Sequence, residues 1–325
     1  MSLERAVRAT VWLAEESAAD ALLVAELSGE QALLGAFQRA GRSGAASELR
    51  GVCGGRSAFA GDGIQLFVAV ASDVRAWLAG ETAALSGARL LNRLVRGALS
   101  GLTQIGVAST YPGRDFVAAN GRRVAQLSLT RTTRGAHVLQ LVVARARPYT
   151  TAERDPEFPG LPPLPPAGAL AIGAEELAAA LARGFASRFA LELEPAELSS
   201  EEERAIAAVR TPPLVDPELA GLRSGGAVAT PIGELEAHVA LRADGALERV
   251  RLRGDWIAAP ADVRALEEAL AGVDPAGARV RELCARWLAA PAHLVVGVTD
   301  PAAIAEAISR AARTHSSASS PPSTQ

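Results

Sequence analysis

The stretch Arg50-Gly51-Val52-Cys53-Gly54-Gly55-Arg56 continues through Ser57-Ala58-Phe59-Ala60-Gly61-Asp62 to Gly63 and then enters the apolar run Ile64–Ala71. Glycine permits positive φ angles and lets the backbone approach other groups closely. Successive amides of such a loop can enclose an anionic oxygen. The pattern therefore predicts a glycine-rich loop that leads into a buried strand, and a plain turn before a strand is the alternative interpretation.

Composition limits the class of protein. A chain of 325 residues, of which 49% are hydrophobic, predicts two domains, or one large domain, with a sizeable core. The formal net charge of -3 provides no overall basic surface for nucleic acid. Two cysteines far apart in sequence argue against a disulfide scaffold and for a reducing cytoplasm. The four histidines have no ligand-type neighbours at short spacing, so no metal site is expected.

The first ten residues are charged, and no apolar run reaches the length of a membrane span. We therefore expect neither a signal peptide nor a membrane segment. The chain contains no lysine, so all 33 residues counted as lysine or arginine are arginine. No side-chain amine is then available for catalysis or for self-modification.

Periodicity and turn residues predict the individual elements. Helices are expected over residues 15–27, 84–104, 172–191, 199–210, 260–271, 276–289 and 301–313. Strands are expected over residues 32–38, 64–71 and 137–144, and residues 3–13 fit either a strand or a helix. Asn120-Gly121 and Asp244-Gly245 each lie between apolar runs and predict two β-hairpins.

Residues 155–168 are rich in proline and predict a stiff surface connection. Taken together, the elements predict an α+β fold: a mixed, largely antiparallel sheet with packed helices, followed by a small α+β accessory domain. We expect the first domain over residues 1–210 and the accessory domain over residues 211–313. The tail, residues 314–325, is rich in serine and proline and predicts disorder.

Several short motifs, in chain order, resemble those of the lipoate–protein ligase A family within the biotin/lipoate ligase fold. Gly35-Ala36-Phe37-Gln38 is similar to a strand that ends in G-R-x-Q. Arg50–Arg56 is similar to an R-R-x-[ST]-G-G-G loop, and Gly113-Arg114-Asp115 to G-R-N-D. Asn120-Gly121-Arg122-Arg123-Val124 resembles the hairpin D-G-R-K-I, and His137 lies at the first histidine of H-H-G-T-L.

The region from Gly233 to Gly272 resembles the small C-terminal accessory domain of that family. The resemblance implies that lipoate, or a related fatty acid, reacts with ATP in the presence of magnesium to give an acyl-adenylate. The acyl group then passes to a lysine of a lipoyl-type carrier domain. It implies a cytoplasmic enzyme with these partners and with no nucleic acid or membrane partner.

The resemblance also implies the site residues. Arg123 stands where the family has the hairpin lysine and is the expected catalytic residue, because positive charge there stabilises the developing oxyanion. The residues expected to bind the ligand or the adenylate are Arg50, Cys53, Gly54, Gly55, Arg56, Asp115, Arg122 and His137.

The chain departs from the family pattern at positions that carry chemistry. Arg56 replaces the third loop glycine, Ala60 the loop histidine and Arg123 the lysine. Arginine keeps the charge but is a wider, planar fork, so a ligase with impaired or altered activity is the first hypothesis. A catalytically silent relative that binds an acyl-adenylate, a carrier domain or a partner protein is the second. The third is ATP-independent acyl transfer through Cys53, which lies between arginines.

Overall fold

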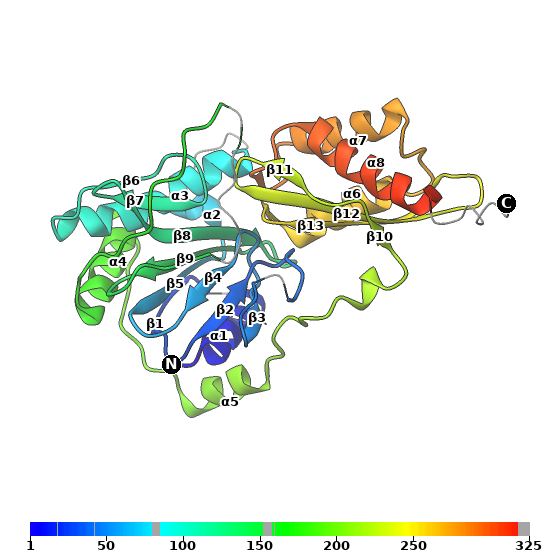
Figure 1. Cartoon of the computed structure of the whole chain (residues 1–325). Coiled ribbons are helices and arrows are strands. Elements are labelled where there is room, and N and C mark those ends of the chain that lie inside the picture. The colour runs from blue at the N-terminus through cyan, green and yellow to red at the C-terminus, as the bar shows by residue number, and fades with distance from the viewer. Residues whose placement is uncertain (18, 42, 80–84, 152–157, 159, 318–325) are drawn as a thin grey trace.

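The computed structural model describes residues 1–17, 19–41, 43–79, 85–151, 158 and 160–317. Two parts lie side by side, the N-terminal part on the left of Figure 1 and the C-terminal part on the right. Each part is built on its own β-sheet with helices packed against it.

A six-stranded sheet forms the centre of the N-terminal part. In spatial order its strands are β1 (Ala21–Glu26), β5 (Ile64–Ala71), β9 (His137–Ala144), β8 (Arg122–Arg131), β7 (Phe116–Ala119) and β6 (Ser109–Thr110). Every neighbouring pair is antiparallel. The apolar runs of the central strands are buried on both faces, so each face needs a cover.

Helices α3 (Gly87–Gln104) and α4 (Ala174–Phe189) cover one face of this sheet, and their apolar sides pack on strand residues such as Phe67 and Leu127. Glycines bring the two helices together. A Cβ at Gly184 would lie 2.2 Å from the amide nitrogen of Gly101, so the backbones themselves are in contact. The predicted helices over 84–104 and 172–191 are therefore confirmed over the residues that the structure describes.

The other face carries α1 (Leu3–Glu15) and a small three-stranded sheet. This sheet has the order β3 (Glu48–Arg50), β2 (Gln31–Leu34) and β4 (Ala58–Ala60), with β2 and β3 parallel and β2 and β4 antiparallel. The glycine-rich loop connects β3 to β4. The predicted α+β class, with a mixed and largely antiparallel sheet, is confirmed.

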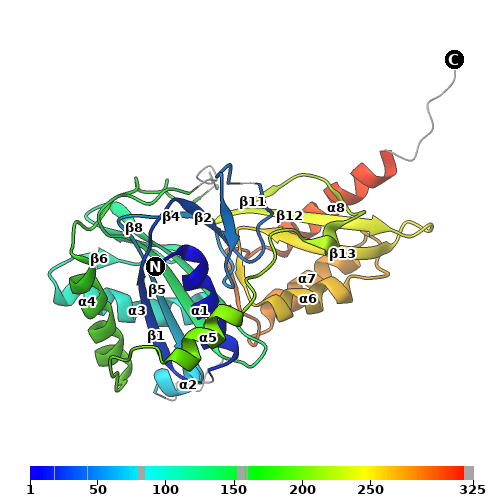
Figure 2. The same cartoon turned by 90° about the horizontal axis from the view of Figure 1, so that it is seen from below.

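After α4 the chain forms α5 (Ser200–Ala208), which packs beside α1 on the N-terminal part (Figure 2), and then enters the C-terminal part. A short 3₁₀ turn, η1 (Pro217–Leu219), follows. The remaining elements are β10 (Arg223–Ser224), β11 (Val228–Thr230), β12 (Gly233–Leu241), β13 (Leu247–Gly254), β14 (Ile257–Ala258), α6 (Pro260–Ala269), α7 (Ala278–Ala289), β15 (Val295–Val296) and α8 (Pro301–Ser317). β12 pairs with β10, β11 and β13 in one antiparallel sheet.

Both predicted hairpins are confirmed, and each has the turn residues that it needs. Asn120 and Gly121 have φ angles of 50° and 71° between β7 and β8, as a two-residue hairpin turn requires. Gly245 has φ 86° between β12 and β13.

Ser199 and Glu202 form a complete capping box at the start of α5.

Two predictions are wrong. Residues 15–27 are not a helix: α1 ends at Glu15, and Ala21–Glu26 is an edge strand that pairs with β5. The acids that suggested a first helical turn lie at the end of a helix instead. The predicted disordered tail does not begin at 314, because α8 continues to Ser317. The rest of that tail, residues 318–325, lies outside the described residues. Part of the proline-rich segment, residues 155–157 and 159, lies outside them as well.

The two parts share core and charged contacts. Ile232, Ile257 and Val296 of the C-terminal part belong to the core of α3 and α4. Asp216 of the connecting segment pairs with Arg50 at 2.9 Å and with Arg253 of β13 at 3.0 Å. One carboxylate therefore bridges the glycine loop and the C-terminal sheet. The domain boundary at 210/211 stays a prediction.

Candidate functional site

Four charged side chains meet beneath the surface near the start of β8. Arg56 of the glycine loop, Arg114 and Asp115 before β7, and Arg123 of β8 are between 2% and 8% exposed. The charges of all three arginines act on the carboxyl group of Asp115. We call these four residues the arginine cluster. Charged side chains are seldom buried to this extent unless they interact with other charges.

Strand register explains how β7 and β8 build one wall of the cluster. Ala118 pairs with Arg123, and Phe116 pairs with Gln126, across a bulge between Val117 and Ala118. Residues that are directly paired point to the same face of a sheet. Side chains three positions apart on a regular strand point to opposite faces. The bulge shifts the register by one residue, so Arg123 and Gln126 point to the same face.

The proline-rich segment holds the backbone of Arg123. The amide of Arg123 donates to the carbonyl of Pro166 at 2.9 Å, and the carbonyl of Arg123 accepts from the amide of Gly168 at 2.8 Å. This pairing is a parallel bridge between Arg123 and Ala167. The segment after β9 therefore holds the start of β8 on the side where β9 does not reach, since β9 pairs with β8 only from Ala125 onward.

Gln126 links Asp115 to the glycine loop. Its Nε2 donates to the carbonyl of Arg56 and to Oδ2 of Asp115, both at 3.4 Å. Burial raises the pKa of the Asp115 carboxyl above its usual range, and the three arginines act in the opposite direction. The cluster thus holds one carboxyl group whose charge depends on the cations around it.

Both terminal nitrogens of the Arg50 guanidinium donate to protein oxygens. Its guanidinium donates to Asp216 and to the carbonyls of Gln38, Pro213 and Leu214 at 2.7–2.9 Å. The side chain is 5% exposed. Arg50 therefore holds the connecting segment against the glycine loop, and a ligand contact by this residue stays a prediction.

Gly54 and Gly55 are needed for close packing. A Cβ at Gly54 would lie 2.6 Å from the carbonyl oxygen of Trp256, and one at Gly35 would lie 2.0 Å from that of Gly55. Gly55 also has φ 128°, which side chains other than glycine rarely adopt. Protein atoms thus occupy the space that a Cβ at Gly54 would need, while Gly55 is required by its φ angle and by the close approach of Gly35. A ligand contact by either glycine stays a prediction.

Cys53 is a buried thiol. It is 2% exposed, and its Sγ donates to the carbonyl of Val138 at 3.4 Å. Burial raises the pKa of Cys53 to about 12, although a hydrogen bond with Ser128 acts in the other direction. The thiolate is the reactive form of cysteine. These surroundings therefore disfavour Cys53 as an acyl acceptor.

The structure does not bring Arg122 and His137 into the cluster. Arg122 is exposed, and it precedes Arg123 in the strand, so the two side chains point to opposite faces. His137 pairs with Arg131, eight positions along β8 from Arg123, or about 26 Å at the usual rise of a strand. Burial lowers the pKa of His137 to about 4, and the charge of Arg131 contributes.

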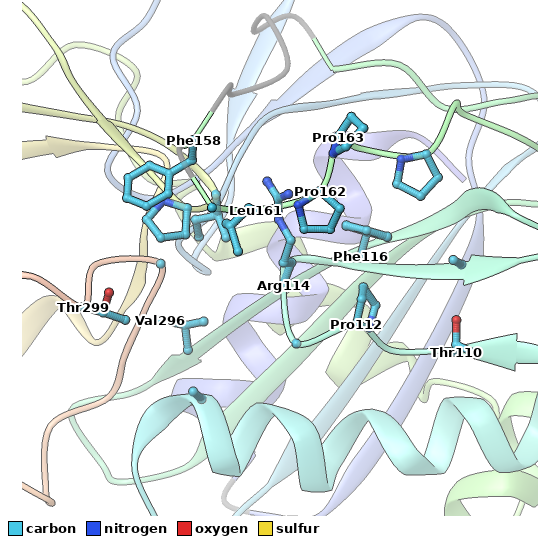
Figure 3. A pocket seen from close by; sticks show the side chains of 18 of the residues that line it. Thr110, Pro112, Arg114, Phe116, Phe158, Leu161, Pro162, Pro163, Val296 and Thr299 are labelled. Atoms are coloured by element: carbon cyan, nitrogen blue, oxygen red, sulfur yellow. The ribbon is translucent and has the colours of Figure 1, made fainter.

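Two cavities adjoin the cluster. The larger has a volume of about 780 Å³ and lies between the two parts of the molecule; Arg114 is on its wall (Figure 3). The smaller lies under the glycine loop, among Cys53, Arg56, Gln126, Ser128 and Gln140, and has a volume of only about 10 Å³. That volume admits no more than about one water molecule.

The wall of the larger cavity comes from segments that are far apart in sequence: Ala88 of α3, and residues within 108–121, 160–165, 231–232 and 295–299, together with Phe158. Sequence reasoning named Arg114 through the G-R-N-D-like motif but missed the apolar wall and Gln126. A signal for Gln126 was present, since it stands where the family resemblance has a small residue. No local sequence pattern predicted the apolar wall, because its residues meet only in the folded chain.

Magnesium finds no ligand set among the described residues. No group of three histidine, cysteine, aspartate or glutamate residues there could hold a metal ion. Asp115 alone offers a carboxyl group at the cluster, and arginines surround it. A hard divalent cation needs several oxygen ligands, so these residues do not fit magnesium by themselves.

None of the described helices is both long and apolar enough to cross a membrane.

No model of a known protein family matches the chain, and no curated protein matches it. Solved structures do. The crystal structure of P. falciparum LipL1 in complex with lipoate aligns with a TM-score of 0.57 and 9% identity, over 88% of this chain and 91% of that chain. At this identity the alignment shows the fold alone: the chain has the biotin/lipoate ligase fold.

Two further structures align less closely. The first is an archaeal bipartite lipoate protein ligase from Thermoplasma acidophilum, with a TM-score of 0.46, 12% identity and coverage of 63% of this chain and 86% of that chain. The second is a biotin protein ligase from Leishmania major in complex with biotin, with a TM-score of 0.30, 13% identity and coverage of 78% and 94%.

Proposed function

We propose that this protein joins lipoate, or a related fatty acid, to a lysine of a carrier domain through an acyl-adenylate, with activity altered by arginine at position 123. The observation that carries the proposal is the buried arginine cluster at the edge of a large apolar cavity. An acyl-adenylate combines these two characters, because it has a hydrocarbon chain at one end and a phosphate at the other.

The arginine cluster suits phosphate chemistry. A guanidinium can hold two oxygens of a phosphate at once through parallel hydrogen bonds. Positive charge held in place before the reaction stabilises the charge that develops at the carboxyl and phosphate oxygens. Arg56, Arg114 and Arg123 already have other contacts, so an entering anion would share or replace these partners. Arg123, fixed at its backbone by Pro166 and Gly168, is the group we assign to the reacting oxygens.

The test of this proposal is pyrophosphate exchange into ATP that depends on octanoate or lipoate, with magnesium present. We expect exchange by the wild-type protein and a rate about 100-fold lower in Arg123→Gln, the usual cost of removing one such donor. Arg183→Gln, at an exposed position of α4, is the matched control and should keep the wild-type rate. No exchange by a folded wild-type protein would contradict adenylation.

A second candidate is a silent relative that binds the acyl-adenylate or the carrier domain without turnover. The small volume beneath the glycine loop favours it, as does Arg56 at the position of the third loop glycine. This candidate predicts binding of a non-hydrolysable acyl-adenylate analogue together with no pyrophosphate exchange. The same pair of measurements therefore separates the two functions.

A further inference from the structure

We propose that a third cavity, at the other end of β8 from Arg123, binds the phosphate group of a small phosphate ester. The cavity has a volume of about 340 Å³. Its wall combines the end of α1, the start of the glycine loop, the end of β8, the connecting segment and the start of α6. Thr130 on this wall is seven positions along β8 from Arg123, or about 23 Å at the usual rise of a strand. The site is therefore separate from the one to which the proposed function is assigned.

Two threonine side chains on the wall carry hydroxyls that can receive a ligand. Thr130 is 3% exposed, and its hydroxyl lies 3.5 Å from the carbonyl oxygen of Ala258, which is longer than an ordinary O–H···O hydrogen bond. The hydroxyl oxygen of Thr132 is buried and has no hydrogen-bond partner among the residues that the structure describes. A buried hydroxyl without a partner is costly, so both positions favour the entry of a hydrogen-bond acceptor.

Arg50 and the start of α6 add two N–H donors. The Nε of Arg50 is buried without a hydrogen-bond partner in the described part of the chain, although both terminal nitrogens are bonded. In the first turn of α6, the amides of Asp262 and Val263 donate to the carbonyl of the residue before the helix, and Pro260 has no amide hydrogen. Ala261, on the cavity wall, supplies the remaining amide. Such a helix N-terminus favours an anion.

The carboxylates on the wall are already bonded to protein donors. Glu15 accepts from the hydroxyl of Thr133 at 3.2 Å, and Asp216 bridges Arg50 and Arg253. Among the described side chains of the wall, the buried polar atoms that lack a partner are the Nε of Arg50 and the hydroxyl oxygen of Thr132. Both of these groups can donate. The cavity is therefore suited to a ligand that is rich in acceptors.

The arrangement of the donors favours phosphate over carboxylate. They come from the glycine loop, from β8 and from α6, and the oxygens of a tetrahedral phosphate point in several directions, whereas those of a carboxylate lie in one plane. Arg131, 29% exposed, adds positive charge on the wall. The volume of the cavity lies at the lower end of the range for sites of small organic ligands. We therefore assign it to a phosphate ester of a small polyol.

The experiment is calorimetric titration of the full-length protein with ribose 5-phosphate, inorganic phosphate and ribose, without ATP or fatty acid. We expect ribose 5-phosphate to bind more tightly than inorganic phosphate, and ribose not to bind. Ala261→Glu places a carboxylate on the wall and should weaken binding of the ester about 100-fold. Thr132→Val removes one donor to a charged group and should weaken it about tenfold. An acidic residue suits the first turn of a helix, so Ala261→Glu should fold.

The matched control for Ala261→Glu is Ala302→Glu. Ala302 follows Pro301 in the first turn of α8, as Ala261 follows Pro260 in α6, and it is exposed and lies outside the cavity. The control for Thr132→Val is Thr103→Val, on α3, where the hydroxyl donates to a carbonyl of its own helix. Both control variants should bind ribose 5-phosphate as tightly as the wild-type protein.

No binding of ribose 5-phosphate by the folded wild-type protein would overturn the proposal. So would an affinity that Ala261→Glu and Thr132→Val leave unchanged, or equal affinities for ribose 5-phosphate and ribose. If thermal melting shows that Ala261→Glu does not fold, Thr132→Val decides. Loss of pyrophosphate exchange in Ala261→Glu would also overturn the proposal, because the cavity would then belong to the acyl-transfer site. Ester binding without any exchange would contradict the proposed function alone, and exchange without ester binding would contradict this inference alone.

Discussion

At Cys53 the surroundings decide the chemistry of the residue. Its position between two arginines suggested an activated thiol, but burial raises its pKa to about 12. At pH 8 about one thiol in ten thousand is then ionised. We expect iodoacetamide to label Cys53 in the native protein about a thousand times more slowly than in denaturant, as followed by peptide mass spectrometry. Labelling of the native protein at the rate of an ordinary cysteine would show that the thiol is accessible and reactive.

His137 makes stability depend on pH. Burial and the charge of Arg131 lower its pKa from 6.5 to about 4. Between these two pH values His137 is protonated in the unfolded chain but not in the folded chain. His137 therefore has no effect on stability above pH 6.5 and destabilises the folded state increasingly as the pH falls toward 4. We expect the free energy of unfolding, measured in urea, to decline over this interval. In His137→Gln the decline should be smaller, and an unchanged slope would contradict the account.

At the scale of elements, the contact between α3 and α4 depends on glycine. A Cβ at Gly184 would lie 2.2 Å from the backbone of Gly101. We expect Gly184→Ala to destabilise the protein by about 1–3 kcal/mol, the usual cost of overpacking, as measured by urea denaturation. Gly173→Ser at the N-cap of α4 is the control, because its Cβ would meet only that of Glu176 at 3.9 Å. Equal stability of both variants would refute the close contact.

Local signals predicted some elements well and others poorly. Asn120-Gly121 and Asp244-Gly245 predicted their hairpins correctly, because the positive φ angles of these turns fall on Asn120, Gly121 and Gly245. Residues 21–26 were mistaken for helix because their strand is set by pairing with β5, a contact that no local pattern reveals. The glycine motif indicated a loop correctly. Its glycines, however, pack on Trp256 and Gly35, and neither contact was predictable from the motif.

The candidate site was predictable only in part. The sequence named all four residues of the arginine cluster, Arg114 through the G-R-N-D-like motif, and the structure brings the four together. Arg122 and His137 were named with them but lie elsewhere, because strand alternation and register separate them from the cluster. The large cavity was not foreseen, since its walls come from segments that meet only in the folded molecule.

At the scale of the whole molecule, Asp216 joins the two parts. Its carboxylate bridges Arg50 and Arg253, whose side chains are 5% and 11% exposed. Removing one partner of a buried ion pair leaves a charge without compensation. We expect Asp216→Ala to lower the free energy of unfolding by about 3 kcal/mol. The measurement is chemical denaturation followed by tryptophan fluorescence.

The exposed pair Arg5–Glu203, between α1 and α5, is the control for this prediction, since both side chains are about half exposed. Glu203→Gln should change the free energy of unfolding by less than about 1 kcal/mol. A loss in Asp216→Ala no larger than in Glu203→Gln would mean that the bridge does not hold the two parts together.

The central claim is that the arginine cluster and the adjoining cavity support transfer of an acyl group. Intact mass spectrometry of an apo lipoyl carrier domain tests it most directly, after incubation with this protein, magnesium and octanoate or lipoate, with and without ATP. Because the chain has no lysine, an acyl group on a lysine can only be on the carrier. We predict an ATP-dependent mass increase of one acyl group on the carrier lysine, about 100-fold slower with Arg123→Gln. No increase under any condition, with a carrier that another ligase modifies, would contradict the claim.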